Sequence, residues 1–278
     1  MDLIDTHQHL ILRDSIGYAW TAEFPVLSGD FTRDDYAALT AGKGIAGTIF
    51  METGVDDADY RAEARLVAGM VGSGGMLGQI ASIRPEDDAG FDEWLAEAAG
   101  LRTVGFRRIL HVVPDGVSQT ATFRRNLRKI GAAGFPFDLN FLARQLIPIG
   151  AALVRACPDQ DYVLDHCGVP DVAAGAFDDW AVGIRVMAAF PNIVVKLSGI
   201  TTYCAPGTAS VALIRPYVDV LLECFGPDRM LWGGDWPVVN LGAGLPRWID
   251  MTRELLSDLS ADEQNAIGQG TARRVYGV

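Results

Sequence analysis

Cysteine is scarce in this chain of 278 residues, and no two cysteines stand close together. Disulfide scaffolds and thiol-based zinc or redox motifs depend on closely patterned cysteines, which this sequence lacks. Few cysteines without a pattern fit free thiols in a reducing compartment, so we expect a cytoplasmic protein. The four are Cys157, Cys167, Cys204 and Cys224.

Long apolar runs and an excess of basic residues are also missing. No stretch reaches the roughly 18 apolar residues of a membrane span. The opening residues, MDLIDTHQHL, lack the basic segment and apolar stretch of a secretory signal, so none is expected. Lys and Arg total 23 against 35 Asp and Glu, a formal net charge of −12. This balance argues against non-specific nucleic-acid binding, which needs a basic face.

No low-complexity tract or linker marks a domain boundary. What recurs is an apolar, β-branched run followed by a helical pattern, about 25 to 40 residues apart. We therefore predict one α/β domain over residues 1–278, a single (β/α)8 TIM barrel. A doubly wound sheet is the alternative, but no GxGxxG follows the first run. The eight runs are Leu3–Thr6, Gly44–Met51, Met76–Ile83, Thr103–Leu110, Pro136–Phe141, Asp161–Asp165, Asn192–Leu197 and Arg229–Trp232.

Helix boundaries carry recognisable signals. Thr32 to Asp35 reads as a capping box before a first helix, and Ser260 to Glu263 as another before the last helix, which should end at Gly277. The stretch 12–29, which contains Trp20, is long for a loop after a first strand. We interpret it as a lid or pocket wall; a surface flap packed by its own aromatic residues is the alternative.

Histidine is rare, and all four histidines stand at the ends of predicted strands. His7 and His9 are two residues apart on the first strand, so their side chains share one face. Converging imidazoles bind a divalent metal or donate to a substrate oxygen. His166 ends the sixth run before a glycine and is expected to act as a ligand or as a donor that polarises a carbonyl.

Two carboxylates stand at strand ends. Glu52 ends an apolar strand, where a carboxylate is costly unless paired. It is a third metal ligand, a partner of a histidine, or a loop carboxylate in water. Asp235 follows two glycines at the end of the eighth run. It could deprotonate a water, hold a metal, or do both in turn, whereas the structural alternative is an Asp that starts a turn.

Basic side chains in the strands give a second set of candidates. Arg107 is expected to point inward and offer its planar fork to substrate, with His111 on the same side. Arg108 lies on the opposite face and is interpreted as a surface salt bridge. Lys196 interrupts an apolar run, so it needs a partner. It pairs with Asp165 or touches substrate, and we favour the pairing.

Together these motifs resemble the amidohydrolase superfamily, and within it the amidohydrolase-2 branch of sugar lactonases and of pyrone-dicarboxylate and sulfomuconolactone lactonases. The resemblance covers nearly the whole chain and keeps the order of the motifs. They are His7-Gln8-His9, Gly105-Phe106-Arg107, Asp165-His166-Cys167-Gly168, Lys196-Leu197-Ser198-Gly199 and Gly234-Asp235-Trp236-Pro237.

The resemblance implies roles for these residues. Asp235 would be the general base on the attacking water, and Arg107 would bind substrate. His7, His9 and His166 would polarise the carbonyl directly or through a metal. Relatives with two metals use a carbamylated Lys on the fourth strand and a His on the fifth, and both are missing here, so two metals are not expected. Some lactonases of this branch need no metal. We expect one zinc ion, held by His7, His9 and Glu52 with Asp235 or His166.

The function predicted from the sequence is therefore hydrolysis of a sugar-type lactone to its hydroxy acid, a step of carbohydrate metabolism. The alternative is a metal-dependent, non-oxidative decarboxylase of an aromatic or related acid. Besides Arg107, we expect His111, Trp236 and Trp20 to contact the substrate. The apolar helix faces fit a homodimer as well as a monomer.

Overall fold

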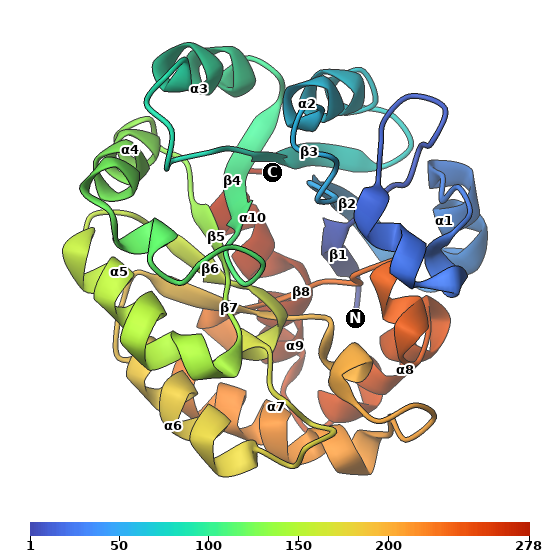
Figure 1. Cartoon of the computed structure of the whole chain (residues 1–278). Helices are drawn as coiled ribbons and strands as arrows, with labels where there is room; N and C mark the ends of the chain where they lie inside the picture. The colour runs from blue at the N-terminus through green and yellow to red at the C-terminus, as the bar shows by residue number, and fades with distance from the viewer.

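A computed structural model describes all 278 residues and contains one eight-stranded parallel sheet, curved into a nearly closed barrel (Figure 1). The strands neighbour one another in chain order. Each predicted run forms a strand whose ends lie within two residues of the predicted ones, so the (β/α)8 fold is confirmed. The strands are β1 Leu3–Gln8, β2 Ile45–Met51, β3 Met76–Ser82, β4 Thr103–Ile109, β5 Phe137–Asn140, β6 Tyr162–Leu164, β7 Ile193–Leu197 and β8 Met230–Trp232.

The first and last strands meet just beyond the end of β8. Gln8 and Trp236 form an isolated parallel bridge. The His9 amide donates to the Trp236 carbonyl at 2.8 Å, and the Asp235 amide donates to the His7 carbonyl at 2.9 Å. These bonds join the two strand ends that carry the predicted histidines and aspartate, and so fix those side chains relative to one another.

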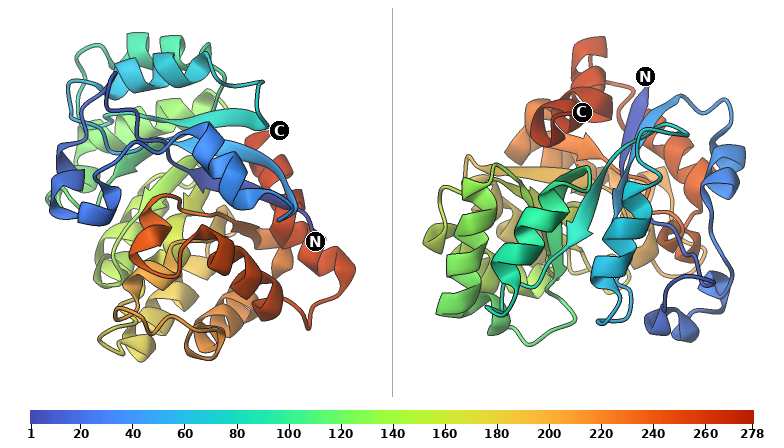
Figure 2. Two further views of the ribbon diagram at one scale, coloured as in Figure 1. Left: turned by 90° about the vertical axis from the view of Figure 1, so that its right-hand side faces the viewer. Right: turned by 90° about the horizontal axis from the view of Figure 1, so that it is seen from above.

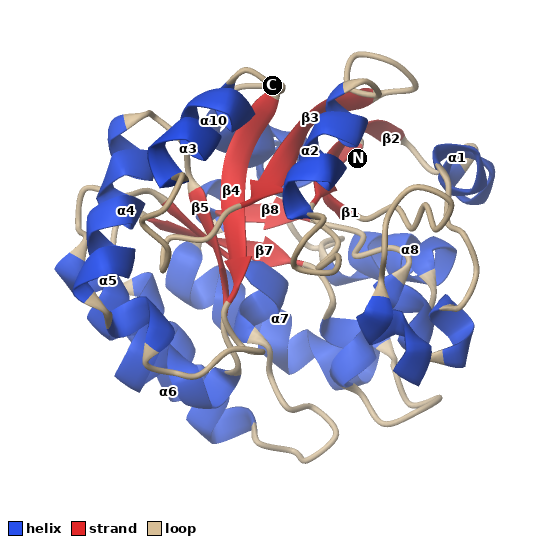
Figure 3. Cartoon of the chain, turned by 45° about the horizontal axis from the view of Figure 1, so that its top comes forward, coloured by secondary structure: helices blue, strands red, loops and turns tan.

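Helices surround the sheet on its outer side (Figure 3). Each buries one stripe, as α4 does with Phe123, Leu127 and Ile130, which recur at helical spacing. The helices are α1 Arg33–Thr40, α2 Tyr60–Ala68, α3 Phe91–Ala99, α4 Ala121–Ala132, α5 Ala152–Ala156, α6 Phe177–Ala188, α7 Val211–Phe225, α8 Leu245–Leu255, α9 Ala261–Asn265 and α10 Thr271–Tyr276. None of them is long and apolar enough to span a bilayer.

The predicted helix boundaries are confirmed. Thr32 and Asp35 form a reciprocal capping box at the start of α1, and Ser260 and Glu263 form another at the start of α9. The last helical stretch ends as predicted at Gly277, which adopts a left-handed φ of 68°. A short π-helical turn between α9 and α10 interrupts what the sequence suggested was one helix.

The loop after β1 folds into two short 3-10 helices, η1 Ala19–Glu23 and η2 Pro25–Leu27. Arg13 holds it together, because its guanidinium donates to Thr21 Oγ1 at 2.8 Å and to the Leu27 carbonyl at 2.7 Å. Figure 2 shows these two helices at the end of the barrel opposite both chain termini. They stand at the carboxyl ends of the strands, where the predicted site residues lie.

Candidate active site

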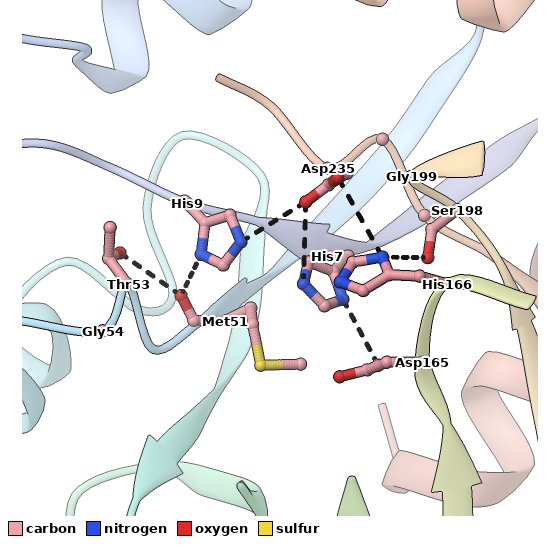
Figure 4. Close-up of polar contacts among 12 residues, drawn as sticks. His7, His9, Met51, Thr53, Gly54, Asp165, His166, Ser198, Gly199 and Asp235 are labelled. Atoms are coloured by element: carbon pink, nitrogen blue, oxygen red, sulfur yellow. Dashed lines mark hydrogen bonds and ion pairs between the residues drawn. The ribbon is translucent and has the colours of Figure 1, made fainter. Parts of the chain in front are cut away.

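His7, His9 and Asp235 converge at the carboxyl end of the barrel (Figure 4). Asp235 Oδ1 lies 3.5 Å from His9 Nε2 and 3.8 Å from His7 Nε2. All three residues are buried. The rings of His7 and His9 stand edge to face with centroids 4.9 Å apart. The two-residue spacing on β1 therefore directs both imidazoles toward the carboxylate delivered by the end of β8.

The second nitrogen of each imidazole is anchored. His9 Nδ1 lies 3.0 Å from the Met51 carbonyl, which can only accept a hydrogen bond, so the proton belongs on Nδ1. His7 Nδ1 faces the Asp165 carboxylate at 3.4 Å. His9 Nε2 then keeps its lone pair free toward Asp235, whereas His7 Nε2 faces both Asp235 and Arg107 Nη1, which lies 3.2 Å away. Burial holds the pKa of His7 well below its usual range, which keeps this ring neutral.

His166 stands on the other side of the same carboxylate. Its Nδ1 lies 3.0 Å from Ser198 Oγ and 4.0 Å from Asp235 Oδ2. Burial lowers its pKa, so this ring is neutral as well. His166 and Asp235 both have positive φ values, 52° and 56°. Left-handed backbone is costly for residues other than glycine, and such residues gather at functional sites.

Behind the histidines lies a buried network of charged side chains. Arg107 contacts Glu52 Oε1 at 2.7 Å and Asp165 Oδ2 at 3.3 Å. Lys196 contacts Asp138 at 2.6 Å and Asp165 at 3.0 Å. Burial alone would raise the pKa of Asp165, but Lys196 and His7 hold it well below its usual range. Lys196 thus pairs with carboxylates as predicted, and Asp165 braces its neighbours.

Two groups of side chains have donor atoms close enough to hold a metal ion. The first is His7, His9 and Asp235, a set of two imidazole nitrogens and one carboxylate oxygen that suits a divalent metal such as zinc. The second is His7, Asp165 and His166. Its carboxylate is already compensated by two cationic side chains, so the first group fits a metal better.

The structure does not bring Glu52 to either group. Its carboxylate is paired with Arg107, and its other oxygen accepts from the Gly54 amide at 3.0 Å. Burial would raise the pKa of Glu52, but Arg107 outweighs that effect and lowers it. Because Arg107 lies between Glu52 and the histidines, with Nη1 at 3.2 Å from His7 Nε2, this carboxylate neutralises the arginine instead of reaching a metal.

Arg107 is itself 2% exposed, and its donors are directed to groups of the chain, including the Glu52 carbonyl at 2.6 Å. These contacts favour a structural role for Arg107 over direct binding of a substrate. Arg108 forms the predicted salt bridge, 2.7 Å from Glu86.

The predicted substrate contacts separate into two kinds. Trp236 is 1% exposed, and its ring packs edge to face against Phe31 and Tyr36, at 5.4 and 5.6 Å between centroids. The indole is therefore packed in the core and is not open to a substrate. Trp20 caps the end of β2 through a 3.0 Å bond from Nε1 to the Thr53 carbonyl. This contact places Trp20 beside the carboxyl end of β2.

His111, the other predicted contact, is half-buried after β4 and is hydrogen-bonded through Nδ1 to the Asn140 amide oxygen. Burial lowers its pKa.

Several residues of the site escaped the sequence reasoning. Asp5 accepts from the amides of Gly234 at 2.7 Å and His7 at 2.9 Å, and so ties β1 to the turn before Asp235. Ser198 holds His166, and Asp138 holds Lys196. Asp5 falls on the same face of β1 as the two histidines, and that alternation was an available signal.

Taken together, a (β/α)8 barrel with histidines and an aspartate gathered at the carboxyl ends of its strands has the layout of an enzyme, because active sites of this fold lie at that end. The family model described as amidohydrolase matches residues 4–278, and the chain belongs to this family.

Similar proteins extend the comparison. The chain is 30% identical over 300 residues to an L-fucono-1,5-lactonase of Burkholderia multivorans, with 98% of this chain and 95% of the relative covered. A crystal structure of an amidohydrolase from Burkholderia multivorans with bound zinc superposes with a TM-score of 0.90 at 28% identity, covering both chains completely. A 5-carboxyvanillate decarboxylase from Sphingomonas paucimobilis superposes at a TM-score of 0.71, covering 100% of this chain and 99% of its own. Its 16% identity shows only the shared fold.

Proposed function

We propose that the protein hydrolyses the lactone of a sugar acid to the open hydroxy acid. The observation that carries this proposal is the convergence of Nε2 of His7, Nε2 of His9 and the Asp235 carboxylate at one point. Similarity along the whole chain to a lactonase supports the same reaction class.

In the proposed reaction Asp235 accepts a proton from a water molecule as that water attacks the lactone carbonyl. The carbon–oxygen bond of the ring then breaks, and the ring oxygen takes the proton back from Asp235. Negative charge develops on the carbonyl oxygen in the transition state, and each fixed donor that stabilises it contributes about 3 kcal/mol. His166 is placed by Ser198 to act on that oxygen or on the leaving oxygen.

A zinc ion held by His7, His9 and Asp235 would supply Lewis acidity toward the carbonyl or the water. The donor set supports this assignment, since burial keeps His7 neutral and the Met51 carbonyl holds the proton of His9 on Nδ1, which leaves Nε2 of His9 as a ligand. Asp165 and Lys196 orient His7, and the Met51 carbonyl orients His9. Groups that contact the other nitrogen of a metal-binding imidazole fix the orientation of the ring and raise its basicity as a ligand.

The first test is Asp235→Asn, assayed by acid release from a panel of five- and six-membered aldonolactones. We expect the variant to fold normally and to lose turnover by at least a thousandfold, because no carboxylate remains to accept the proton. The matched control is Asp115→Asn, the same change at an exposed carboxylate that pairs with Arg144 at 3.1 Å. Rates near those of the unaltered enzyme in Asp235→Asn would refute the role.

Chelation addresses the metal in the same assay. We expect chelated enzyme to lose acid release and to regain it with zinc, while metal analysis shows less bound zinc in His9→Ala. Full activity in metal-free enzyme would overturn the zinc assignment and leave the roles of the side chains standing. Release of CO2 from an aromatic acid, with no acid release from any lactone, would replace the proposal with decarboxylation.

A further inference from the structure

A hollow of about 770 Å³ is lined by residues of the segments that follow β5, β6 and β7, including part of α6. We call it the Tyr203 groove. Eight of its thirteen lining residues are hydrophobic. Loops after barrel strands lie at the catalytic end, so the groove shares that end with Asp235. Its apolar wall is formed by Leu142, Ile147, Pro148, Val169, Trp180 and Tyr203.

Tyr203 and Val169 connect this groove to the reacting groups. The Tyr203 ring stands edge-on to His166, with centroids 6.4 Å apart. Val169 donates its amide to the His166 carbonyl at 2.8 Å. Its own carbonyl accepts from the Ala143 amide at 3.3 Å, and the Tyr203 carbonyl accepts from the Ala173 amide at 2.9 Å. These backbone bonds tie the three loops into one wall that begins at His166.

The groove is electrostatically unsuited to an anion. Its charged lining residues are Arg144, Asp171 and Asp179, and Arg144 is already paired with Asp115 at 3.1 Å. A carboxylate bound there would lose its hydration without gaining a free cation.

The cationic side chains around the reaction centre are committed as well. Arg107 and Lys196 are fully occupied by buried carboxylates. Arg84 lies 2.8 Å from Asp57, and Arg108 lies 2.7 Å from Glu86. No arginine or lysine near the histidines is left to hold a substrate carboxylate.

Apolar side chains of the groove are open to solvent. Ile147 is 42% exposed and Val182, which also lines the groove, is 52% exposed. Subsites for small molecules are largely apolar and concave, with a few polar groups that set orientation. The groove has this character, and Tyr203 in its lining is a neighbour of His166.

We propose that the Tyr203 groove is a subsite for an uncharged, apolar substituent on the lactone ring, and that it rejects a substituent that carries a carboxylate. This inference rests on the proposed lactone hydrolysis. It makes Tyr203 the boundary between the reacting carbonyl and the part of the substrate that determines specificity.

The test compares three five-membered lactones: the unsubstituted ring, the ring with a butyl chain, and the ring with a carboxyalkyl chain of equal length. Full burial of a methylene corresponds to a gain of about fourfold, so partial burial of four predicts that the butyl lactone exceeds the unsubstituted one roughly tenfold or more in kcat/KM. The carboxyalkyl lactone should fall at least tenfold below the butyl lactone.

Ile147→Lys then places a cation in the groove. The ratio of kcat/KM for the butyl lactone to that for the unsubstituted lactone should fall several-fold, and the carboxyalkyl lactone should improve. The matched control is Leu213→Lys, an exposed leucine on α7 that does not line the groove. It should leave all three ratios unchanged. Equal rates for the three lactones in the unaltered enzyme, or unchanged ratios in Ile147→Lys, would overturn the subsite.

A binding measurement separates this inference from the proposed reaction. If no lactone of either panel is hydrolysed, the proposed function fails, and calorimetry with butyl-tetrahydrofuran still tests the groove. We expect the unaltered protein to bind this probe, Ile147→Lys to bind it at least several-fold more weakly, and Leu213→Lys to bind it with the same affinity as the unaltered protein. Absence of binding, or equal binding to all three proteins, would refute the subsite independently of catalysis.

Discussion

Glu63 on α2 is a buried carboxylate without a cationic partner. It is 2% exposed, and Oε1 accepts from the Thr53 amide at 2.9 Å. Burial raises its pKa from 4.5 to about 8, and the negative charge of Glu52 adds to the rise. We predict that Glu63→Gln stabilises the protein, and that the gain grows with pH.

The direction follows from proton binding. Between pH 4.5 and 8 the folded protein keeps a proton on Glu63 that the unfolded chain has released. Stability contributed by this group is therefore complete below pH 4.5 and falls as the pH rises toward 8. Glutamine keeps an oxygen for the Thr53 amide and does not titrate. At about 1.4 kcal/mol per pH unit, the difference between variant and unaltered protein should increase by about 3 kcal/mol from pH 5 to 7.5.

Urea denaturation at pH 5 and at pH 7.5, followed by tryptophan fluorescence, measures this difference directly. The control is Glu97→Gln on α3, where an exposed glutamate pairs with Arg65 at 2.6 Å. Solvent screens that pair, so its difference should hardly change over the same interval. A difference between Glu63→Gln and the unaltered protein that is the same at both pH values would refute the assignment of a buried proton to Glu63.

Two further substitutions test the packing around the site. Gly199→Ala should lower the free energy of unfolding by about 1 to 2 kcal/mol because φ is +63°. It should also abolish most activity, because the new Cβ would lie 2.5 Å from His166 Nδ1. The control Gly207→Ala, at φ +75° with nothing within 4 Å, should lose stability but keep its turnover. Lys196→Met should lower the free energy of unfolding by about 3 to 5 kcal/mol, measured by urea denaturation, and adding Asp138→Asn should restore part of that loss. An equal loss in the double variant would contradict an ion pair between Lys196 and Asp138.

The barrel could be predicted because its signals are local. Each strand is a short apolar run of the right length, and the Thr32 and Ser260 capping boxes lie within four consecutive residues. The alternation of side chains along β1 likewise predicts that His7 and His9 share one face. Features that depend on a few neighbouring residues can be recognised without knowledge of the fold.

The pairings inside the barrel could not be predicted in the same way. Glu52 and Arg107 are 55 positions apart, and Lys196 and Asp138 are 58 apart. The pairing of carboxylates with cations depends on the register of the strands in the closed barrel, and no short stretch of sequence reveals that register. Trp236 shows the same limit, since its neighbour Asp235 turns inward while its own ring packs against Phe31.

The charges of the site explain why a divalent cation would fit beside Asp235. Arg107 compensates Glu52, and Lys196 compensates Asp165. Burial raises the pKa of Asp138 to about 7 in spite of Lys196, so this carboxylate carries a proton for part of the neutral range. Asp235, which is 2% exposed, has only His7, His9 and His166 within ion-pair distance. A buried carboxylate with no lysine or arginine beside it is suited to hold a divalent cation, which is a role that the proposed function gives to Asp235.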